Sequence, residues 1–291
     1  MKDAARLVAY FVATVLFGAL LAPPLYWGAQ ALIAHGHLGF LAKFGFESFF
    51  HRALLIGAIV FFWPLLRSLG VRSFRDLGLE KNPRPARDVF AGFTIAAVPL
   101  LCFAAGLLVF GIYSFRSASA GAVASRWIAA AVVPFIEEPL FRGLILGVLL
   151  RSCTPRIATL ITSAFFAIIH FLKPPDDTSS IVTWTSGFAS VANAFAQFAE
   201  PLLVLAGFTT LFLLAWILAD ARIRTRSLWL PIGLHAGWIF AAATFSKLAR
   251  RQMLPLPWLG NNLLIGIAPL CVGLLSWALL RLWLQHVNRR R

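Results

Sequence analysis

The stretch that decides the fold is PFIEEPLFRGLI, residues 134–145. It lies within an apolar segment, residues 127–150, that is long enough to cross a bilayer as a helix. Glu137, Glu138 and Arg142 place two acids and one base inside that segment, where each charge costs about 3 kcal/mol or more in lipid. Such groups are tolerated when they face the interior of a helix bundle and partner one another. The stretch therefore predicts a polar site inside a membrane protein.

The composition agrees with a membrane protein. The chain has 291 residues, of which 60% are hydrophobic and 13% charged, and its mean hydropathy is +0.82. These values are typical of polytopic membrane proteins. Apolar segments of the roughly 17–25 residues that a bilayer requires occur at 7–33, 53–69, 89–114, 127–150, 157–173, 201–220, 227–247 and 262–285. We expect an all-α, polytopic protein with about eight transmembrane helices in a single bundle.

The net charge of +15 is best explained by membrane topology. Most of the 26 lysines and arginines fall on one side of the predicted membrane, which places both termini in the cytoplasm. No loop is large enough to fold into a basic face for nucleic acid, so we expect no nucleic-acid partner. The three cysteines, Cys102, Cys153 and Cys271, have no paired spacing and predict neither a disulfide framework nor a zinc site.

Two connecting segments have features of their own. Residues 38–52 alternate apolar and polar positions, and we expect them to lie flat in the membrane interface. The longest outer loop, 173–200, begins with a Pro-Pro break and is half apolar. It is either a surface helix or a partly re-entrant lid over a cavity, and its length favours a functional part.

Spacing within the fourth segment separates its two acids. Glu138 and Arg142 are four residues apart, on one helix face and close enough for an ion pair. Glu137 is turned about 100° from Glu138, which leaves it free to act elsewhere. Taken alone, the ion pair between Glu138 and Arg142 also has a purely structural explanation, in which it stabilises the helix and takes no part in a reaction. Pro134 and Pro139 each remove a backbone donor and loosen the helix beside the acids.

Two histidines lie in other apolar segments, His170 toward the end of the fifth and His235 in the middle of the seventh. A single histidine on an apolar helix is usually a packed residue that needs only a hydrogen-bond partner. Two histidines together with two acids instead predict one shared polar pocket.

These residues resemble a known family, the type II CAAX prenyl endopeptidases, which belong to the wider CPBP group, also called the ABI or bacteriocin self-immunity group. The resemblance covers roughly residues 90–247. The matching positions are Glu137-Glu138-x-x-x-Arg142, Phe166-x-x-x-His170 and His235. It implies an N-terminal part (1–88) with a basic cytoplasmic loop, a CAAX protease-like catalytic core (89–247), and a last span with a basic tail (248–291).

The resemblance implies a role for each matching residue. Glu137 activates a water for attack on a peptide carbonyl, and His170 helps to position or deprotonate that water. Glu138 and Arg142 orient the site. His235 donates to the oxyanion of the tetrahedral intermediate.

The sequence departs from the family pattern at Ile239, where the family commonly has an asparagine four residues after the histidine. Isoleucine cannot donate a hydrogen bond, and the loss of one oxyanion donor costs about 10²–10³ in rate. Trp238, one position earlier, and Asn193, in the outer loop, are the candidate substitutes. Trp238 is otherwise a packing aromatic.

A metal is the remaining chemical question. Glu137, His170 and His235 supply the His₂Glu set of a catalytic zinc site. No HExxH pair is present. We therefore favour a metal-free mechanism without a cofactor, with zinc on these three residues as the alternative.

The sequence thus predicts an intramembrane endopeptidase of the CAAX type. We expect it to be located in the bacterial plasma membrane and to cut a membrane-associated peptide or protein, whether or not that substrate carries a prenyl or other lipid group. Two alternatives remain: a non-catalytic self-immunity-type membrane protein, favoured by Ile239, and a proton-coupled transporter. A transporter predicts paired repeats with broken helices, and the sequence has no second EExxxR-like copy.

Overall fold

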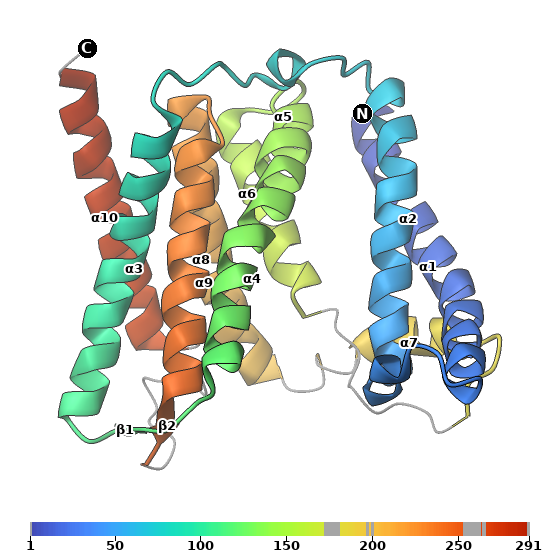
Figure 1. Ribbon diagram of the computed structural model, residues 1–291. Helices are drawn as coiled ribbons and strands as arrows, with labels where there is room; N and C mark the ends of the chain where they lie inside the picture. Colours follow the sequence, from blue (N-terminus) through green and yellow to red (C-terminus); the bar gives the residue numbers. More distant parts are fainter. Residues whose placement is uncertain are drawn as a thin grey trace. The chain divides into compact units, whose positions relative to one another are not determined.

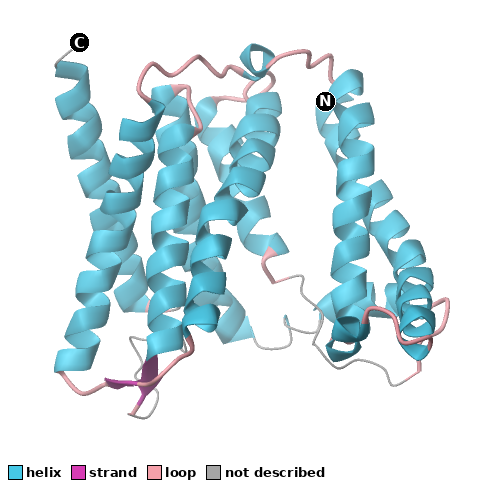
Figure 2. Ribbon diagram, viewed as in Figure 1, coloured by secondary structure: helices cyan, strands magenta, loops and turns pink. Residues whose placement is uncertain are grey.

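The computed structural model describes residues 2–171, 181–195, 198, 201–252, 263 and 266–289, and most of them are helical (Figure 2). The long elements are α1 (Lys2–Ala34), α2 (Phe46–Ser68), α3 (Pro85–Val109), α4 (Ala120–Glu138), α6 (Pro155–Ile169), α8 (Pro201–Thr225), α9 (Trp229–Leu248) and α10 (Ile267–Arg289). The short elements are η1 (Gly39–Lys43), η2 (Phe74–Leu77), β1 (Tyr113–Phe115), the π-helix η3 (Pro139–Ile145), α5 (Leu146–Leu149), α7 (Ser186–Ala194) and β2 (Ala249–Arg251).

The chain divides into two compact units (Figure 1). The first comprises Met1–Ser73 and Ile168–Val204, and the second comprises Phe74–Ala167 and Leu205–Arg291. The predicted division into 1–88, 89–247 and 248–291 follows the family motif rather than packing, and it stays a prediction.

The first unit is built from α1, α2 and α7. Phe46 and Phe50 of α2 are buried with alanines of α1, and their i, i+4 spacing puts both on one helix face. The prediction of a flat interfacial segment is therefore wrong for residues 46–52, because they form the first turns of α2. In the outer loop, 186–194 is a helix whose Ser190 donates to the buried Glu47 carboxylate at 2.8 Å. Residues 172–180, 196–197 and 199–200 of that loop lie outside the described residues.

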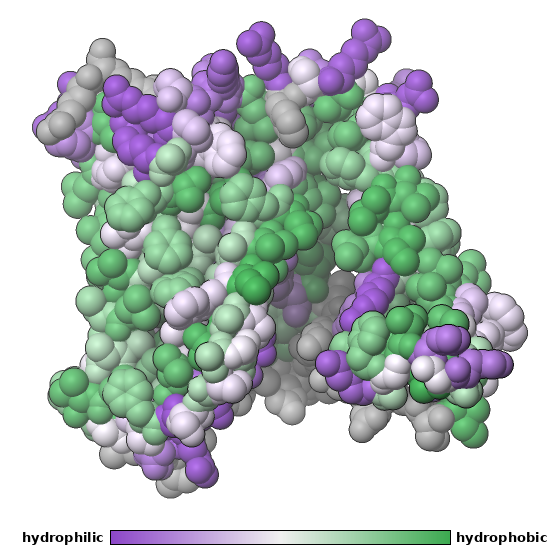
Figure 3. Space-filling model, viewed as in Figure 1, coloured by the Kyte–Doolittle hydropathy of each residue, from purple (hydrophilic) through white to green (hydrophobic). Residues whose placement is uncertain are grey.

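The second unit is a helical bundle in which α3 lies along α9, with α4 and α10 beside this pair (Figure 1). Its core consists of fully buried apolar side chains from α3, α8, α9 and α10, among them Leu100, Ile217, Leu234 and Leu280. On the face shown in Figure 3 its sides are hydrophobic, whereas hydrophilic residues gather at its two ends. This is the surface expected of a bundle that spans a bilayer.

The all-α membrane fold is confirmed. Each of the eight predicted segments coincides with a helical stretch. Five helices in the described part of the chain are long and apolar enough to cross a membrane, and α6 is a shorter apolar helix. The number of eight spans stays a prediction.

One small element was not predicted from the sequence, the pairing of β1 with β2. The two strands are antiparallel, with Ser114 opposite Arg250 at the centre of the register. They join the end of α3 to the end of α9, so the two helices are fixed to each other beyond their own contact.

Helices α3 and α9 touch through their backbones. A Cβ added at Gly233 would lie 2.1 Å from the Val89 carbonyl oxygen, and one added at Gly237 would lie 2.5 Å from that of Phe93. Two small residues four positions apart allow this approach, which is a common means of helix association in membranes. His235 is located between the two glycines on the same helix. Its position therefore depends on this backbone contact.

We expect Gly233→Ala to destabilise the protein, because the new methyl group would overlap the α3 backbone. Overpacking of this kind costs about 1–3 kcal/mol. The control is Gly106→Ala on α3, where an added Cβ meets no atom within 4 Å. Unfolding of both variants in mixed detergent micelles provides the measurement. Equal stability of Gly233→Ala and Gly106→Ala would contradict the close contact.

Candidate active site

The charged stretch begins where the α-helical hydrogen-bond pattern ends. Pro139 has no N–H, so it cannot donate to the carbonyl four residues earlier, and α4 ends at Glu138. The chain continues as the π-helix η3, and the N–H of Leu146 donates to the Phe141 carbonyl, five residues back. π-Helical segments within α-helices often mark functional sites. Here the wider turn carries the Arg142 side chain.

Glu138 is the central acceptor of the site. Its side chain is completely buried, and one oxygen, Oε1, contacts both Arg142 Nη1 at 3.0 Å and His235 Nδ1 at 2.8 Å. The i, i+4 ion pair predicted from the sequence is therefore present. The second contact brings α9 to the acid, so Glu138 joins two helices that are far apart in the sequence.

Arg142 is also completely buried, and it has partners on three sides. Besides Glu138, its Nη2 donates to the Ala215 carbonyl of α8 at 3.3 Å. Its guanidinium carbon lies 4.5 Å from the centre of the Phe166 ring, a cation–π contact. The same ring meets the His235 ring edge to face at 6.1 Å. The Phe166 ring thus packs against both Arg142 and His235 and restricts the positions of their side chains.

Glu137 has different surroundings from Glu138. Its side chain is 28% exposed, whereas that of Glu138 is 0% exposed. Its Oε2 lies 3.9 Å from His235 Nε2, which is too long for a direct hydrogen bond. The imidazole therefore stands between the two acids, with Nδ1 toward the paired acid and Nε2 toward the accessible one.

The contacts of His235 assign its proton. Glu138 is ionised because it pairs with Arg142, and a carboxylate only accepts hydrogen bonds. Nδ1 of His235 must then carry hydrogen and donate it to Glu138. In the neutral ring Nε2 is left with a lone pair, and it carries a proton only in the imidazolium.

Arg222 is a site residue that sequence reasoning missed, because its position among basic loop residues suggested a topological role. In the structure it is 3% exposed. Its Nε donates at 3.1 Å to the Arg142 carbonyl. In a regular α-helix this carbonyl would accept from the Leu146 N–H, which in η3 donates to Phe141 instead. The Nη2 of Arg222 contacts the Leu77 carbonyl. Within the described residues no carboxylate pairs with it. Helical periodicity was the available signal, since Leu218 and Arg222 share the buried face of α8.

The remaining predicted residues lie away from this cluster or in the other unit. His170 is exposed, in the turn directly after α6, and belongs to the first unit, as does Asn193 of α7. The predicted pairing of His170 with Glu137 stays a prediction. Trp238 packs in the core of the second unit, 4% exposed, and its buried indole N–H has no acceptor among the described residues. Ile239 is half-buried, one turn after His235.

The described residues contain no group of three or more His, Cys, Asp or Glu side chains arranged to hold a metal ion. Glu137, Glu138 and His235 do come together, but Arg142 supplies the positive charge beside them. The predicted zinc set also includes His170, from the first unit, so it stays a prediction.

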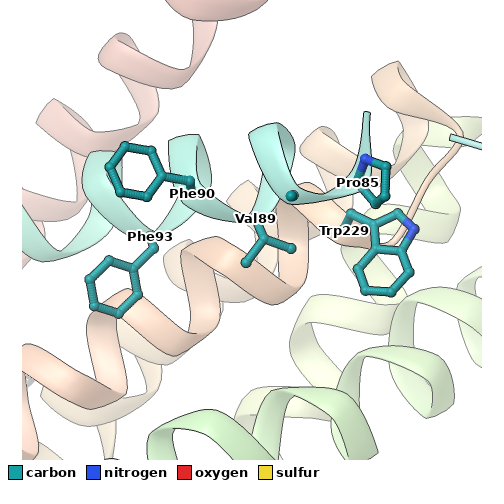
Figure 4. Close-up of a pocket in the computed structure, with 6 residues that line it drawn as sticks. Pro85, Val89, Phe90, Phe93 and Trp229 are labelled. Atoms are coloured by element: carbon teal, nitrogen blue, oxygen red, sulfur yellow. The ribbon is translucent and has the colours of Figure 1, made fainter. Parts of the chain in front are cut away.

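An apolar groove of about 470 Å³ in the second unit is lined by the first turns of α3 and by Trp229 at the start of α9. Figure 4 shows Val89, Phe90 and Phe93 of α3 and Trp229 of α9 along it. The Trp229 ring also packs against Phe135, two residues before Glu137, with 6.2 Å between ring centres. The groove has no group that could carry out chemistry. The Glu137–Glu138–Arg142–His235 cluster, which we call the charged cluster, is the candidate active site.

Comparison with known proteins places this cluster in a family. Residues 119–241, from the start of α4 to the middle of α9, match the family described as "Type II CAAX prenyl endopeptidase Rce1-like". The match includes every member of the charged cluster, and the resemblance seen in the sequence is confirmed. No curated protein and no solved structure matches the chain. Residues 119–241 are therefore similar to the CAAX-type intramembrane proteases, and the chain is an integral membrane protein.

Replacing Glu138 by Gln should destabilise the protein, because Arg142 would stay buried without its counter-charge. Breaking a buried ion pair from one side costs about 3–5 kcal/mol. The matched control is Glu80→Gln, which removes an acid from an exposed pair with Arg226 and should change stability little. Unfolding in detergent compares the two. A Glu138→Gln protein as stable as Glu80→Gln would show that the buried pair does not support the fold.

Proposed function

We propose that the protein is an endopeptidase that hydrolyses a peptide bond within the membrane with a water activated by Glu137. The family match supports peptidase chemistry in general. The observation that carries the finer proposal is the unequal environment of the two acids. Glu138 is completely buried and neutralised by Arg142, whereas the Glu137 side chain is 28% exposed, and its buried oxygen, Oε2, has no hydrogen-bond partner among the described residues.

Glu137 is suited to act as the general base. A water bound to its carboxylate can also contact His235 Nε2, because the two groups are 3.9 Å apart. Glu137 takes a proton from this water as the oxygen attacks the carbonyl carbon of the substrate. It then returns the proton to the leaving nitrogen as the C–N bond breaks, so the carboxylate is regenerated.

His235 is suited to stabilise the oxyanion when it is protonated. Its Nδ1–H is committed to Glu138, so only the imidazolium presents an N–H at Nε2. In that form the Nε2–H, on the side of Glu137, can donate to the developing oxyanion.

The charges also favour a mechanism without metal. A zinc ion bound between Glu137 and His235 would have to approach the buried Arg142 guanidinium, which already neutralises Glu138. His235 would offer only Nε2, on the side of Glu137. The electrostatic role of a metal is thus filled by Arg142 and His235, and we propose that the enzyme needs no cofactor.

The substrate we propose is a membrane-associated peptide or protein, cut near its C-terminus, with or without a prenyl group. Hydrolysis in a membrane requires water at the site, and Glu137, whose side chain is 28% exposed, is the acid of the charged cluster that water can reach. We also propose that both termini face the bacterial cytoplasm, in keeping with the excess of basic residues on that side. Reporter fusions at residue 80 and at the C-terminus test this orientation, and a translocated C-terminus would contradict it.

A non-catalytic protein of the self-immunity type is the second candidate. Ile239 favours it, because the turn after His235 lacks the amide donor of the family pattern. The Trp238 ring is part of the core, where its indole N–H has no acceptor among the described residues. The two candidates differ in one observable, which is peptide cleavage.

Glu137→Gln should lower turnover by about 10²–10⁴-fold, the usual contribution of a general base, and leave stability unchanged. The amide has the same shape but cannot take the proton from water. Full-length protein in proteoliposomes is incubated with a library of lipid-anchored peptides, and products are identified by mass spectrometry. Glu80→Gln is the control with wild-type activity. Cleavage by Glu137→Gln at the wild-type rate would reject the role of Glu137, and no cleavage by the wild type would favour the self-immunity reading.

Cleavage should continue at an undiminished rate after treatment with a strong chelator, because water is activated by Glu137 rather than by a metal ion. The same proteoliposomes are assayed before and after chelation, with a known zinc peptidase treated in parallel. Loss of activity that added zinc restores would replace the proposed mechanism with a His₂Glu metal site.

A further inference from the structure

A second pocket of the second unit lies away from the charged cluster. It has a volume of about 560 Å³ and is lined by the start of α6, the last turns of α8 and the second half of α10. Three arginines and one aspartate contribute to its wall: Arg156, Arg224, Arg281 and Asp220. No member of the proposed catalytic machinery lines it.

Asp220 organises the pocket. One of its carboxylate oxygens accepts a hydrogen bond from Arg224 Nε at 2.8 Å. The other accepts one from the Trp277 indole at 3.0 Å and lies 3.0 Å from Arg281 Nε. Because each guanidinium meets the aspartate with Nε, the donors on its terminal nitrogens are left for another partner. The side chains of Arg224 and Arg281 are 43% and 39% exposed, so a ligand can reach them.

The charges in the pocket do not balance. Arg156, in the first turn of α6, forms no ion pair with any residue that the structure describes. Three guanidinium groups and one carboxylate leave a net charge of +2. The N-terminus of α6 adds its own partial positive charge. A purely structural network would tend toward neutrality, whereas this excess, held in a preformed pocket, suits an anion with several oxygens.

The position of the pocket identifies the kind of anion. Helices α8 and α10 are both candidate membrane spans, and α8 ends at Thr225, five residues after Asp220. At 1.5 Å per residue, Asp220 lies roughly 7–8 Å inside the helix end, near headgroup depth. Trp216 and Trp277 line the same pocket, and tryptophan is enriched at the membrane interface. A charged ligand at this depth with aromatic neighbours is amphiphilic.

We propose that this pocket binds the phosphate-bearing headgroup of an anionic phospholipid from the leaflet at that end of the bundle. Arg156, Arg224 and Arg281 contact the phosphate oxygens, and Asp220 holds two of these arginines in place. Basic pockets between transmembrane helices are known to bind lipid headgroups. The site is independent of the proposed peptidase reaction, because its occupancy is read as binding and not as cleavage.

The experiment measures lipid binding to the full-length protein in detergent micelles by native mass spectrometry. Phosphatidylglycerol is titrated against the wild type, Arg156→Gln, the double variant Arg156→Gln/Arg281→Gln, and the control Arg84→Gln. Arg84 precedes α3 and forms no ion pair in the described chain, so its replacement removes the same charge outside the pocket. We expect binding to weaken about tenfold or more in the double variant and severalfold in Arg156→Gln, and less than twofold in Arg84→Gln.

Two further arms identify the source of the phosphate. Phosphatidylcholine should bind more weakly than phosphatidylglycerol, and millimolar glycerol 3-phosphate should not displace the lipid. If Arg84→Gln weakened the binding of phosphatidylglycerol as much as the pocket variants do, the effect would be one of general surface charge, and the proposal would be overturned. So would displacement by glycerol 3-phosphate, which would indicate a soluble ligand. Melting temperatures are measured for all variants, and if the double variant does not fold, Arg156→Gln decides, because it disrupts no ion pair.

Discussion

The carboxylate of Glu138 is the group on which the second unit depends. It is fully buried, and a single oxygen joins Arg142 of η3 to His235 of α9. Arg142 extends the connection to α8 through the Ala215 carbonyl. An isolated charge at this place would be prohibitively costly, so each member of the network requires the others. Three helical segments that could slide against one another in a purely apolar bundle are therefore held in a single register.

The backbone is arranged to serve this network. Pro139 ends the α-helical pattern directly after the two acids. Arg222 donates to the Arg142 carbonyl, which does not receive the usual helical hydrogen bond from the Leu146 N–H in the π-turn. The glycines of α9 bring its backbone against α3, so His235 is carried on a firmly placed helix. The result is an unequal pair of neighbouring acids. Glu138 joins the helices through its ion pair and its contact with His235, whereas the side chain of Glu137, one residue earlier, is 28% exposed.

The sequence predicted what depends on local spacing and on composition. The i, i+4 relation of Glu138 and Arg142 and the cost of charges in lipid were enough to predict the ion pair and its meeting with His235. The π-turn, the capping by Arg222 and the pairing of β1 with β2 depend on contacts between distant residues, which periodicity does not encode. Asp220 illustrates the limit well. The three side chains that converge on it come from different parts of the chain, Arg224 from the next turn of α8 and Trp277 and Arg281 from α10. The role of His170 rests on the family motif alone.

The π-turn has a consequence for the length of this segment. It accommodates one residue more than an α-helical turn of the same rise, so the helix that follows keeps its phase with α4 although the chain is one residue longer. A further residue inserted between 139 and 143 would exceed what the π-turn takes up, and every later residue would be rotated by about 100°. Leu144, Leu146 and Val148, all at most 1% exposed, would turn out of the core. The spacing between the acids and the apolar face that follows them is thus fixed, which makes this segment far less tolerant of a further insertion than of substitutions.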